Sequence, residues 1–163
     1  MTLVPEIHRL FGDRVRLRVC GICRRGDDVL LIRHEGIGTK GYLWAPPGGG
    51  VHFGEALDQT LIREFQEETH LEITVGPFLF LNEFIRPPLH AIELFFAADE
   101  RGGTLQRGHD PEMAPHTQLI GEVAFVPFAH IKQDDPALYH NAFGEIEHLD
   151  DLYRLGGRAF SSR

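Results

Sequence analysis

Residues 46–71 read PPGGGVHFGEALDQTLIREFQEETHL, and this stretch changes character partway along its length. It begins with two prolines and three glycines, which break regular structure and let the backbone approach a ligand without a Cβ in the way. From Ala56 to Thr69 it contains no glycine or proline and is rich in good helix formers. The pattern predicts a glycine-rich loop that leads into the N-terminus of a helix, a natural place for an anion.

The predicted helix carries an apolar side and an adjoining acidic side. At about 100° per residue, one side gathers Leu57, Leu61, Ile62 and Phe65. Glu64, Glu67 and Glu68 follow at i, i+3 and i+4, so they lie next to one another. In projection Glu68 falls between two of the leucines, which predicts that at least one carboxylate lies at the edge of the apolar side.

Three neighbouring carboxylates repel one another, and partial burial increases the cost. Either their pKa values rise and they take up protons, or a cation binds among them. Clustered carboxylate oxygens are the hard ligands that Mg²⁺, Mn²⁺ or Ca²⁺ prefer. The alternative interpretation is a solvated acidic end of a helix. The glycines upstream favour a site for a metal and a phosphate.

The same residues resemble the Nudix box, G-x5-E-x7-R-E-U-x-E-E-x-G-U, in which U is an apolar residue. Gly49 and Glu55 match its start, and Arg63 to Leu71 match its end at the right spacing. One position departs from the pattern, because His70 stands where the box has glycine. That glycine usually ends the helix in a left-handed conformation, which His adopts less readily. The departure puts the geometry of the helix exit in doubt and touches no expected ligand.

The resemblance implies a role for each matching residue. Mg²⁺, which Mn²⁺ could replace, would be held by Glu64, Glu67, Glu68 and the carbonyl of Gly48. Arg63 would pair with Glu55 and orient the acids, although a surface pair with Glu67 is the simpler alternative. The general base would be Glu64, Glu68 or a glutamate on a distant loop.

Residues outside the acidic side complete the predicted site. The loop candidate for the base is Glu112, although a loop glutamate is more commonly just solvated. The expected substrate contacts are Gly49, Gly50, Trp44 and Arg86, and Trp44 could equally belong to the core. Glu93 alternates with apolar neighbours on its strand, so it could face either the cleft or the solvent.

Strand-like and helix-like segments surround the box. Strands are predicted over 14–24, 29–33, 72–84, 90–98 and 122–128, the first two as a hairpin, with a long surface loop over 107–117 and a mostly helical segment over 135–155. The fold class that this predicts is α+β, an α/β/α sandwich with a mixed sheet flanked by helices. No repeat or linker divides residues 1–163, so we expect a single Nudix hydrolase domain.

Composition limits the classes of partner that we expect and favours one cellular compartment. The net charge of -8 disfavours long nucleic acids, whose binding needs Lys and Arg against phosphates, and leaves small phosphorylated ligands open. No apolar run is long enough to span a bilayer and no secretory signal is visible, which favours the cytoplasm. Cys20 and Cys23 form a C-x-x-C without a second pair, so we expect two buried free thiols on opposite faces of a strand.

The resemblance implies magnesium-dependent hydrolysis of a pyrophosphate bond in a nucleoside diphosphate linked to another group. A proline placed like Pro87 is typical of the ADP-ribose pyrophosphatases, although it also suits an ordinary loop. ADP-ribose or an ADP-sugar is the first expected substrate and a nucleoside triphosphate the second, and the Ser-Gln-Pro-Trp-Trp type of segment of nicotinamide dinucleotide pyrophosphatases is absent. Alternatives are a nucleotide-sensing module without activity and a metal-stabilised structural protein. A homodimer stays open by analogy.

Overall fold

The computed structural model describes residues 3–157 and 159–162. The predicted first hairpin is present as β1 (Val15–Arg25) and β2 (Asp28–Glu35). The two strands pair only next to their turn, at Arg24 with Val29 and at Arg25 with Asp28, and then separate. Beyond this point β1 pairs with β4 (Gly48–Gly50) and β2 pairs with β3 (Tyr42–Ala45). The hairpin therefore joins two groups of strands that diverge from it.

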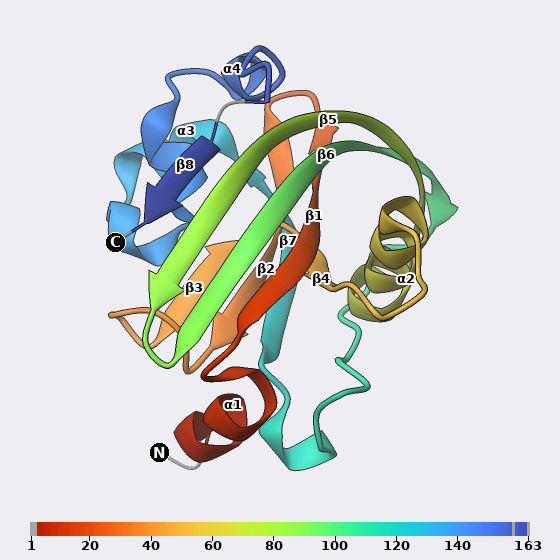
Figure 1. Ribbon diagram of the computed structural model, residues 1–163. Helices are drawn as coiled ribbons and strands as arrows, with labels where there is room; N and C mark the ends of the chain where they lie inside the picture. The colour runs from red at the N-terminus through yellow and green to blue at the C-terminus, as the bar shows by residue number, and fades with distance from the viewer. Residues whose placement is uncertain (1–2, 158, 163) are drawn as a thin grey trace.

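The longest hairpin of the described residues is formed by β5 (Leu71–Arg86) and β6 (Leu89–Gly103). The strand β6 runs parallel to β1, and β8 (Ala159–Ser162) runs parallel to β5 at the outer edge. The remaining strand, β7 (Ile120–Pro127), pairs with β2. The order in the described residues is β3-β2-β1-β6-β5-β8, with β4 on β1 and β7 on β2 (Figure 1).

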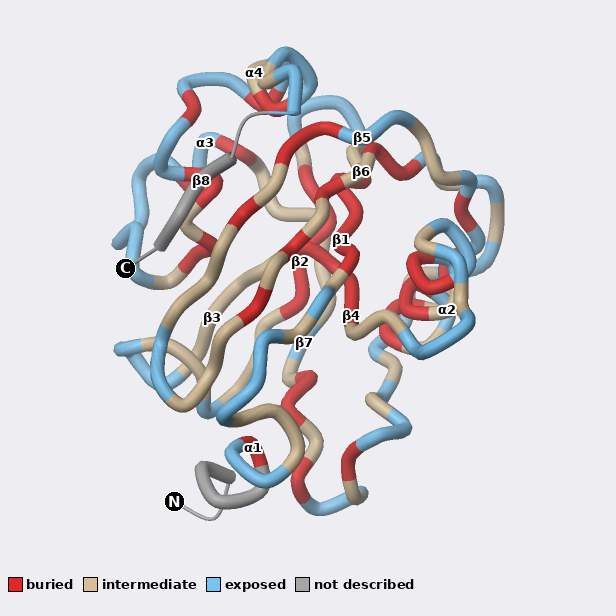
Figure 2. Tube along the Cα trace, in the orientation of Figure 1, coloured by how far each residue is buried: buried red, intermediate tan, exposed pale blue. Residues whose placement is uncertain are grey.

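Helices cover the sheet from two sides, as the predicted α/β/α sandwich requires (Figure 1). On one side α2 (Leu57–Thr69) buries Leu61 and Phe65 in a cluster that includes Cys23. On the other side the segment after β7 closes a larger cluster that includes Cys20 and Phe143. Both thiols are free and buried, so the predicted structural cysteines on opposite faces are confirmed. Figure 2 shows the buried residues concentrated between the layers.

The prediction of a mostly helical segment over 135–155 was wrong. After α3 (Phe128–Gln133) it contains two short 3₁₀ turns, Pro136–Leu138 and Asn141–Glu145, and one α-helical turn, α4 (Leu149–Leu152). Side chains here accept from the backbone amides that a helix would use: Asp135 accepts from Ala137, His140 from Ala142, and Asp151 from Glu147 and His148. Such local bonds compete with helix formation.

The N-terminal helix α1 (Leu3–Phe11) was not predicted. Ile7 on this helix packs with Met113 and Leu119, so α1 contacts the segment before β7. In the part of the chain that the structure describes, no helix combines the length and apolar character that a membrane span requires.

Candidate functional site

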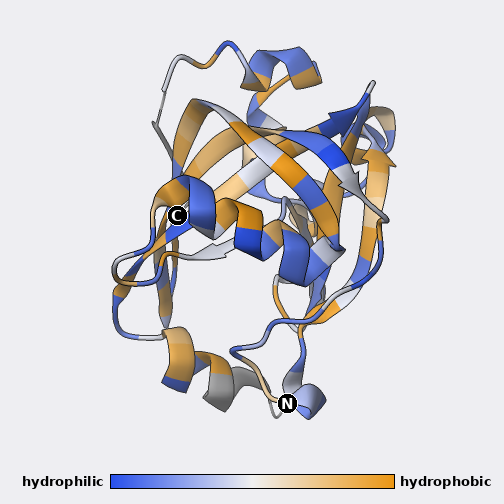
Figure 3. Ribbon diagram, turned by 90° about the vertical axis from the view of Figure 1, so that its right-hand side faces the viewer, coloured by the Kyte–Doolittle hydropathy of each residue, from blue (hydrophilic) through white to orange (hydrophobic). Residues whose placement is uncertain are grey.

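The helix α2 ends at the residue that departs from the box. His70 takes a left-handed conformation, with φ 59° and ψ 14°, and its N–H donates to the carbonyl of Gln66 over 3.2 Å. Histidine therefore does here what glycine usually does, and the helix exit keeps its turn. The helix also has an apolar and an acidic side as predicted, since Leu61 and Phe65 are buried in the core and Glu64 and Glu68 are buried at the edge of that apolar side. Figure 3 shows this alternation along α2.

The acidic residues of α2 line a cavity of about 120 Å³, which we call the acidic cavity. The residues that the sequence pointed to and that meet there are Gly48, Gly49, Gly50, Arg63, Glu64, Glu67, Glu68 and Glu112. Residues that the sequence did not point to also line it, among them Arg16, Arg18 and Asp110. The structure thus brings the loop, the helix and one strand to a single place.

Arg63 connects the acids to the start of the box. Its Nε and Nη2 donate to the two carboxylate oxygens of Glu55 over 2.8 and 3.0 Å. Its Nη1 donates to Glu64 over 2.8 Å and to Glu67 over 3.1 Å, and Nη2 also reaches the carbonyl of Gly50 over 3.3 Å. The paired hydrogen bonds from Arg63 hold the pKa of Glu55 at about 2. The orienting geometry expected of Arg63 is therefore present, and the surface pair with Glu67 is only one part of it.

Two of the three glutamates are buried. Burial raises the pKa of Glu64, and the charge of Arg63 offsets this effect in part. Burial and the charge of Glu64 raise the pKa of Glu68 well above its usual value, although the amide of Gly48 donates to it over 3.0 Å. The raised pKa values mean that negative charge in this cavity lacks sufficient positive charge nearby.

These donors suit a hard divalent cation, because carboxylate and carbonyl oxygens dominate and the buried acids lack compensating charge. As they stand, no three His, Cys, Asp or Glu side chains of the described residues converge closely enough to hold an ion. Arg63 holds Glu64 and Glu67 at present, and the Gly48 amide holds Glu68. Metal binding would therefore draw the other oxygens, Glu64 Oε2, Glu67 Oε1 and Glu68 Oε1, together, while one oxygen of each carboxylate keeps its present donor.

Gly49 lies directly against the Glu64 carboxylate, where a Cβ would overlap it. We expect Gly49→Ala to fold normally, because the carboxylate can swing aside, and to lower kcat/KM by about 10-fold or more, because Glu64 is then misplaced. The control is Gly144→Ala, since no atom lies within 4 Å of a Cβ at that position. The two variants should differ in turnover and agree in melting temperature. Equal turnover would show that the position of Glu64 does not matter.

A long loop between β6 and β7 reaches back over the end of α2. The amides of Gln106, Gly108 and His109 donate to the carbonyls of Thr69, Glu68 and Glu67, over 3.0, 2.9 and 3.1 Å respectively. A Cβ at Gly108 would overlap the carbonyl oxygen of Glu67, so the loop lies flat against the helix backbone. These bonds place the loop acids beside the helix acids.

Asp110 and Glu112 are the loop acids that line the acidic cavity. Burial raises the pKa of Asp110. The Glu112 carboxylate is 40% exposed and lies 2.7 Å from Nε2 of His52. The sequence pointed to Glu112 and missed Asp110, although both belong to the same proline-bracketed segment.

Arg16 and Arg18 of β1 line the acidic cavity together with the acids. Residues two apart in a strand point to the same face, so the alternation of arginine and apolar residues in β1 could have indicated this pair. Arg18 donates from Nη2 to the carbonyl of Gly48 over 3.1 Å. Burial and the charge of Arg18 lower the pKa of Arg16 to about 10, so Arg16 still carries its charge near neutral pH.

Two further cavities continue from the acidic cavity. The first, of about 90 Å³, shares Arg16 and Arg18 with it, and we call it the middle cavity. The second, of about 490 Å³, shares Leu43, Phe84 and His140 with the middle cavity, and we call it the distal cavity. The largest of these three cavities thus shares no lining residue with the acidic cavity.

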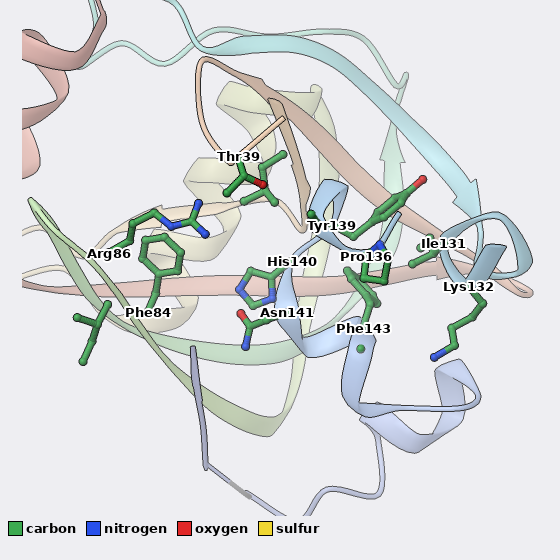
Figure 4. A pocket seen from close by; sticks show the side chains of 14 residues that line it. Thr39, Phe84, Arg86, Ile131, Lys132, Pro136, Tyr139, His140, Asn141 and Phe143 are labelled. Carbon is green, nitrogen blue, oxygen red and sulfur yellow. The ribbon is translucent and has the colours of Figure 1, made fainter. Parts of the chain in front are cut away.

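Two expected substrate contacts lie away from the acidic cavity. Arg86 lines the distal cavity, and its Cζ lies 5.9 Å from the centre of the Phe84 ring (Figure 4). Trp44 packs against the larger core cluster, while its neighbours Leu43 and Ala45 line the middle cavity. Because successive side chains of a strand point to opposite faces, Trp44 is directed away from the ligand side. The structure therefore places Trp44 against the core, and Trp44 is not among the residues that line the three cavities.

A family model described as the NUDIX domain matches residues 14–143. The chain belongs to the NUDIX domain family. The segment that resembles the box, Gly49 to Leu71, lies within the match, and three of its acids, Glu64, Glu67 and Glu68, lie on α2. The match covers most residues that line the three cavities, while Ile7 and Phe11 of the acidic cavity and Gly144 of the distal cavity lie outside it.

Known proteins resemble this NUDIX domain over part of their length. An ADP-ribose pyrophosphatase of Methanocaldococcus jannaschii is 35% identical over 103 residues, which are 62% of this chain and 60% of that protein. A NAD-capped RNA hydrolase of Pectobacterium atrosepticum is 33% identical over 89 residues, 55% of this chain and 32% of that protein. The chain therefore spans well under two thirds of these relatives. A solved NUDIX hydrolase of Nitrosomonas europaea has a TM-score of 0.69 at 17% identity, covering 90% of this chain and 93% of that chain, which shows the shared fold.

Proposed function

We propose that this NUDIX domain hydrolyses the pyrophosphate bond of a nucleoside diphosphate linked to a second group. The observation that carries the proposal is the acidic cavity, which Glu64, Glu67 and Glu68 on α2 line together with Arg16 and Arg18 on β1. Acids and arginines in the lining of one small cavity suit a ligand that combines a cation with phosphate oxygens. A purely structural acidic patch would have no need of these arginines.

The cation would be Mg²⁺, or Mn²⁺ in its place, held by Glu64, Glu67, Glu68 and the carbonyl of Gly48. When bound, it supplies Lewis acidity toward the phosphate oxygens and lowers the pKa of coordinated water. Such chemistry depends mainly on positioning and electrostatics, so the surrounding side chains decide the rate.

The chain's own residues would orient the substrate and move the proton. Arg16 and Arg18 would bind phosphate oxygens, since both are charged and line the cavity. Arg63 would keep Glu64 and Glu67 in place through the contacts that it already makes with them. Glu112 is the base that we favour over Glu64 and Glu68. Its carboxylate lines the cavity, remains accessible to water, and is held by His52 alone among the described side chains.

We infer that the first substrate to test is ADP-ribose or a related ADP-sugar. The similarity to a protein named ADP-ribose pyrophosphatase supports this choice, and so does Pro87 downstream of the box. A nucleoside triphosphate is the second choice. The sensing module without activity is less favoured, because a sensor has no need of three metal-side acids. Cytoplasmic location and a homodimer stay predictions.

The test is a panel of ADP-ribose, ADP-glucose, NAD and ATP with Mg²⁺, analysed by chromatography of the products. We expect AMP and ribose 5-phosphate from ADP-ribose, and no turnover after chelation of the metal. The products also show which bond is broken. Release of inorganic phosphate from ATP, for example, would indicate that a bond other than the proposed one is cut. Absence of metal-dependent turnover across the panel and its close analogues would overturn the proposal in favour of a sensing module.

The raised pKa values of Glu64 and Glu68 predict how Mg²⁺ affects stability. Because their pKa in the folded state exceeds that of the unfolded chain, protonation favours folding, and this stability is lost as pH rises through the raised pKa. We expect Mg²⁺ to raise the melting temperature near neutral pH and to have little effect at about pH 4 to 5, where protons compete with it. Thermal melts with and without Mg²⁺ at several pH values measure this. A stabilisation that does not change with pH would contradict it.

A further inference from the structure

The middle cavity lies between the acidic cavity and the distal cavity and is mostly apolar. Its apolar lining comes from Ile37, Leu43, Ala45, Phe84, Leu89 and Ala91, and its polar lining from Arg16, Arg18, His34, His90, Glu93 and His140. It opens to the acidic cavity along Arg16 and Arg18. A group attached to a phosphate in the acidic cavity would therefore enter this space first. The aromatic ring of Phe84 and the aliphatic walls suit a flat, largely apolar group.

Glu93 lies on the lining of the middle cavity and is held rigidly. Its side chain is 11% exposed. Its Oε2 accepts from Nδ2 of Asn82 over 2.9 Å and lies 2.8 Å from Nε2 of His140. Asn82 is in turn held by Asn141, which donates to Asn82 Oδ1 over 2.7 Å. These contacts fix the Glu93 carboxylate and use one of its oxygens.

The other oxygen of Glu93, Oε1, can still accept a hydrogen bond. Nε of Arg18 lies 3.9 Å from Oε1, which is too far for a hydrogen bond. Burial opposes ionisation of Glu93, but His140 and Arg18 hold its pKa at about 2. Glu93 is therefore a carboxylate, and Oε1 can only accept.

Arg18 supplies the matching donor. Of the buried side-chain nitrogen and oxygen atoms in the described residues, Arg18 Nε is the one without a hydrogen-bond partner. Buried donors are nearly always paired, so an unpaired one in a cavity wall calls for a ligand or a water. The Arg18 guanidinium is otherwise oriented by its bond to the Gly48 carbonyl. The middle cavity thus offers one donor and one acceptor side by side.

We propose that Arg18 and Glu93 recognise the Watson–Crick edge of an adenine ring seated in the middle cavity. This inference rests on the proposed function and names the base that the substrate carries. Adenine N1 would accept from Arg18 Nε, and the 6-amino group would donate to Glu93 Oε1. Adenine has two polar groups on this edge and an apolar C2–H beside them, whereas guanine, cytosine and uracil carry three. In an apolar cavity the third group of those bases would be left unpaired, which is costly.

The experiment measures binding without turnover. Calorimetry in the presence of a chelator compares AMP with purine riboside 5′-monophosphate, which lacks the 6-amino group, and with GMP. We expect AMP to bind about 10- to 100-fold more tightly than the other two, because the purine analogue lacks the donor to Glu93 and guanine would leave its 2-amino group unpaired in the cavity. Equal affinity for AMP and the purine analogue, tighter binding of GMP, or no measurable binding of AMP would overturn the proposal.

Glu93→Gln tests the acceptor itself. The donors of Asn82 and His140 favour the amide oxygen at the position of Oε2, so the amide nitrogen would face the cavity and repel the adenine amino group. We expect the preference for AMP over the purine analogue to fall to about 1- to 3-fold. The control is Glu100→Gln on the same strand, whose carboxylate pairs with Arg25 over 2.7 Å at the surface and should leave the preference unchanged.

The outcomes separate this inference from the proposed function. Discrimination in binding without any hydrolysis would overturn the proposed function and keep the adenine site. Hydrolysis of ADP-ribose without discrimination between the bases would do the reverse. If Glu93→Gln fails to fold, the comparison of nucleotides on the unaltered protein still decides the question.

Discussion

Glu68→Gln is expected to lower kcat by roughly 10²- to 10³-fold while the protein stays folded. Glu68 is buried at the edge of α2 and lines the acidic cavity, so its charge is available to a cation and hardly to water. Glutamine keeps the shape of the side chain and its contact with the Gly48 amide. It removes the negative charge. Steady-state kinetics with ADP-ribose as Mg²⁺ is varied measure the effect.

The same substitution is expected to stabilise the metal-free protein or leave it unchanged near neutral pH. Because the pKa of Glu68 is raised in the folded state, its ionised form opposes folding there, and a neutral side chain removes that cost. Activity and stability should thus move in opposite directions. Glu122→Gln, an exposed change on β7, is the control and should alter neither. If Glu64→Gln, Glu67→Gln and Glu68→Gln all keep full rates, the mechanism is wrong.

Arg63→Lys is expected to lower both kcat and stability, although the charge is conserved. The guanidinium of Arg63 contacts Glu55 with two nitrogens and also reaches Glu64 and Glu67. A lysine ammonium cannot reproduce this planar fork. We expect kcat to fall by about 10²-fold, because Glu64 and Glu67 lose their orientation. The free energy of unfolding should fall by about 2 kcal/mol through the lost hydrogen bonds to Glu55.

Arg25→Lys is the matched control, because Arg25 also makes two hydrogen bonds to one carboxylate, that of Glu100, but at the exposed end of β1. An exposed pair of this kind contributes about 0–1 kcal/mol, so stability should change little and turnover not at all. Chemical denaturation and kinetics on both variants provide the comparison. If the two variants lose the same stability and both retain activity, Arg63 has the surface role that its spacing from Glu67 alone would suggest.

The box and its helix could be predicted from the sequence because local rules determine them. Glycines, prolines and helix formers divide residues 46–71 into loop and helix, and the spacing of Glu64, Glu67 and Glu68 fixes their common edge. The strands β1, β2, β5, β6 and β7 were also predicted, and the structure extends most of them by one to a few residues. Alternation along β1 placed the two cysteines on opposite faces, as observed.

Other parts depend on contacts between distant segments and could not be predicted. Residues 135–155 favour a helix by their propensity. They form only short turns, because side chains accept from nearby amides and because the segment packs on the larger cluster. The face that Trp44 presents depends on the pairing of β3 with β2, which the sequence leaves undetermined. Asp110 and Arg18 meet the glutamates only because the loop and β1 fold against α2. The role of Glu93 could not be decided, since it depends on its bonds with Asn82 and His140.

The flat contact between Gly108 and α2 has a consequence for how the loop can vary. Glu67 and Glu68 serve the acidic cavity with their side chains and anchor the loop with their carbonyls. Any side chain at position 108 would wedge the two segments apart, and Glu112 would then be carried outward with the loop. The distance between Glu112 and α2 therefore depends on Gly108 having no side chain, although Gly108 itself contributes no functional group.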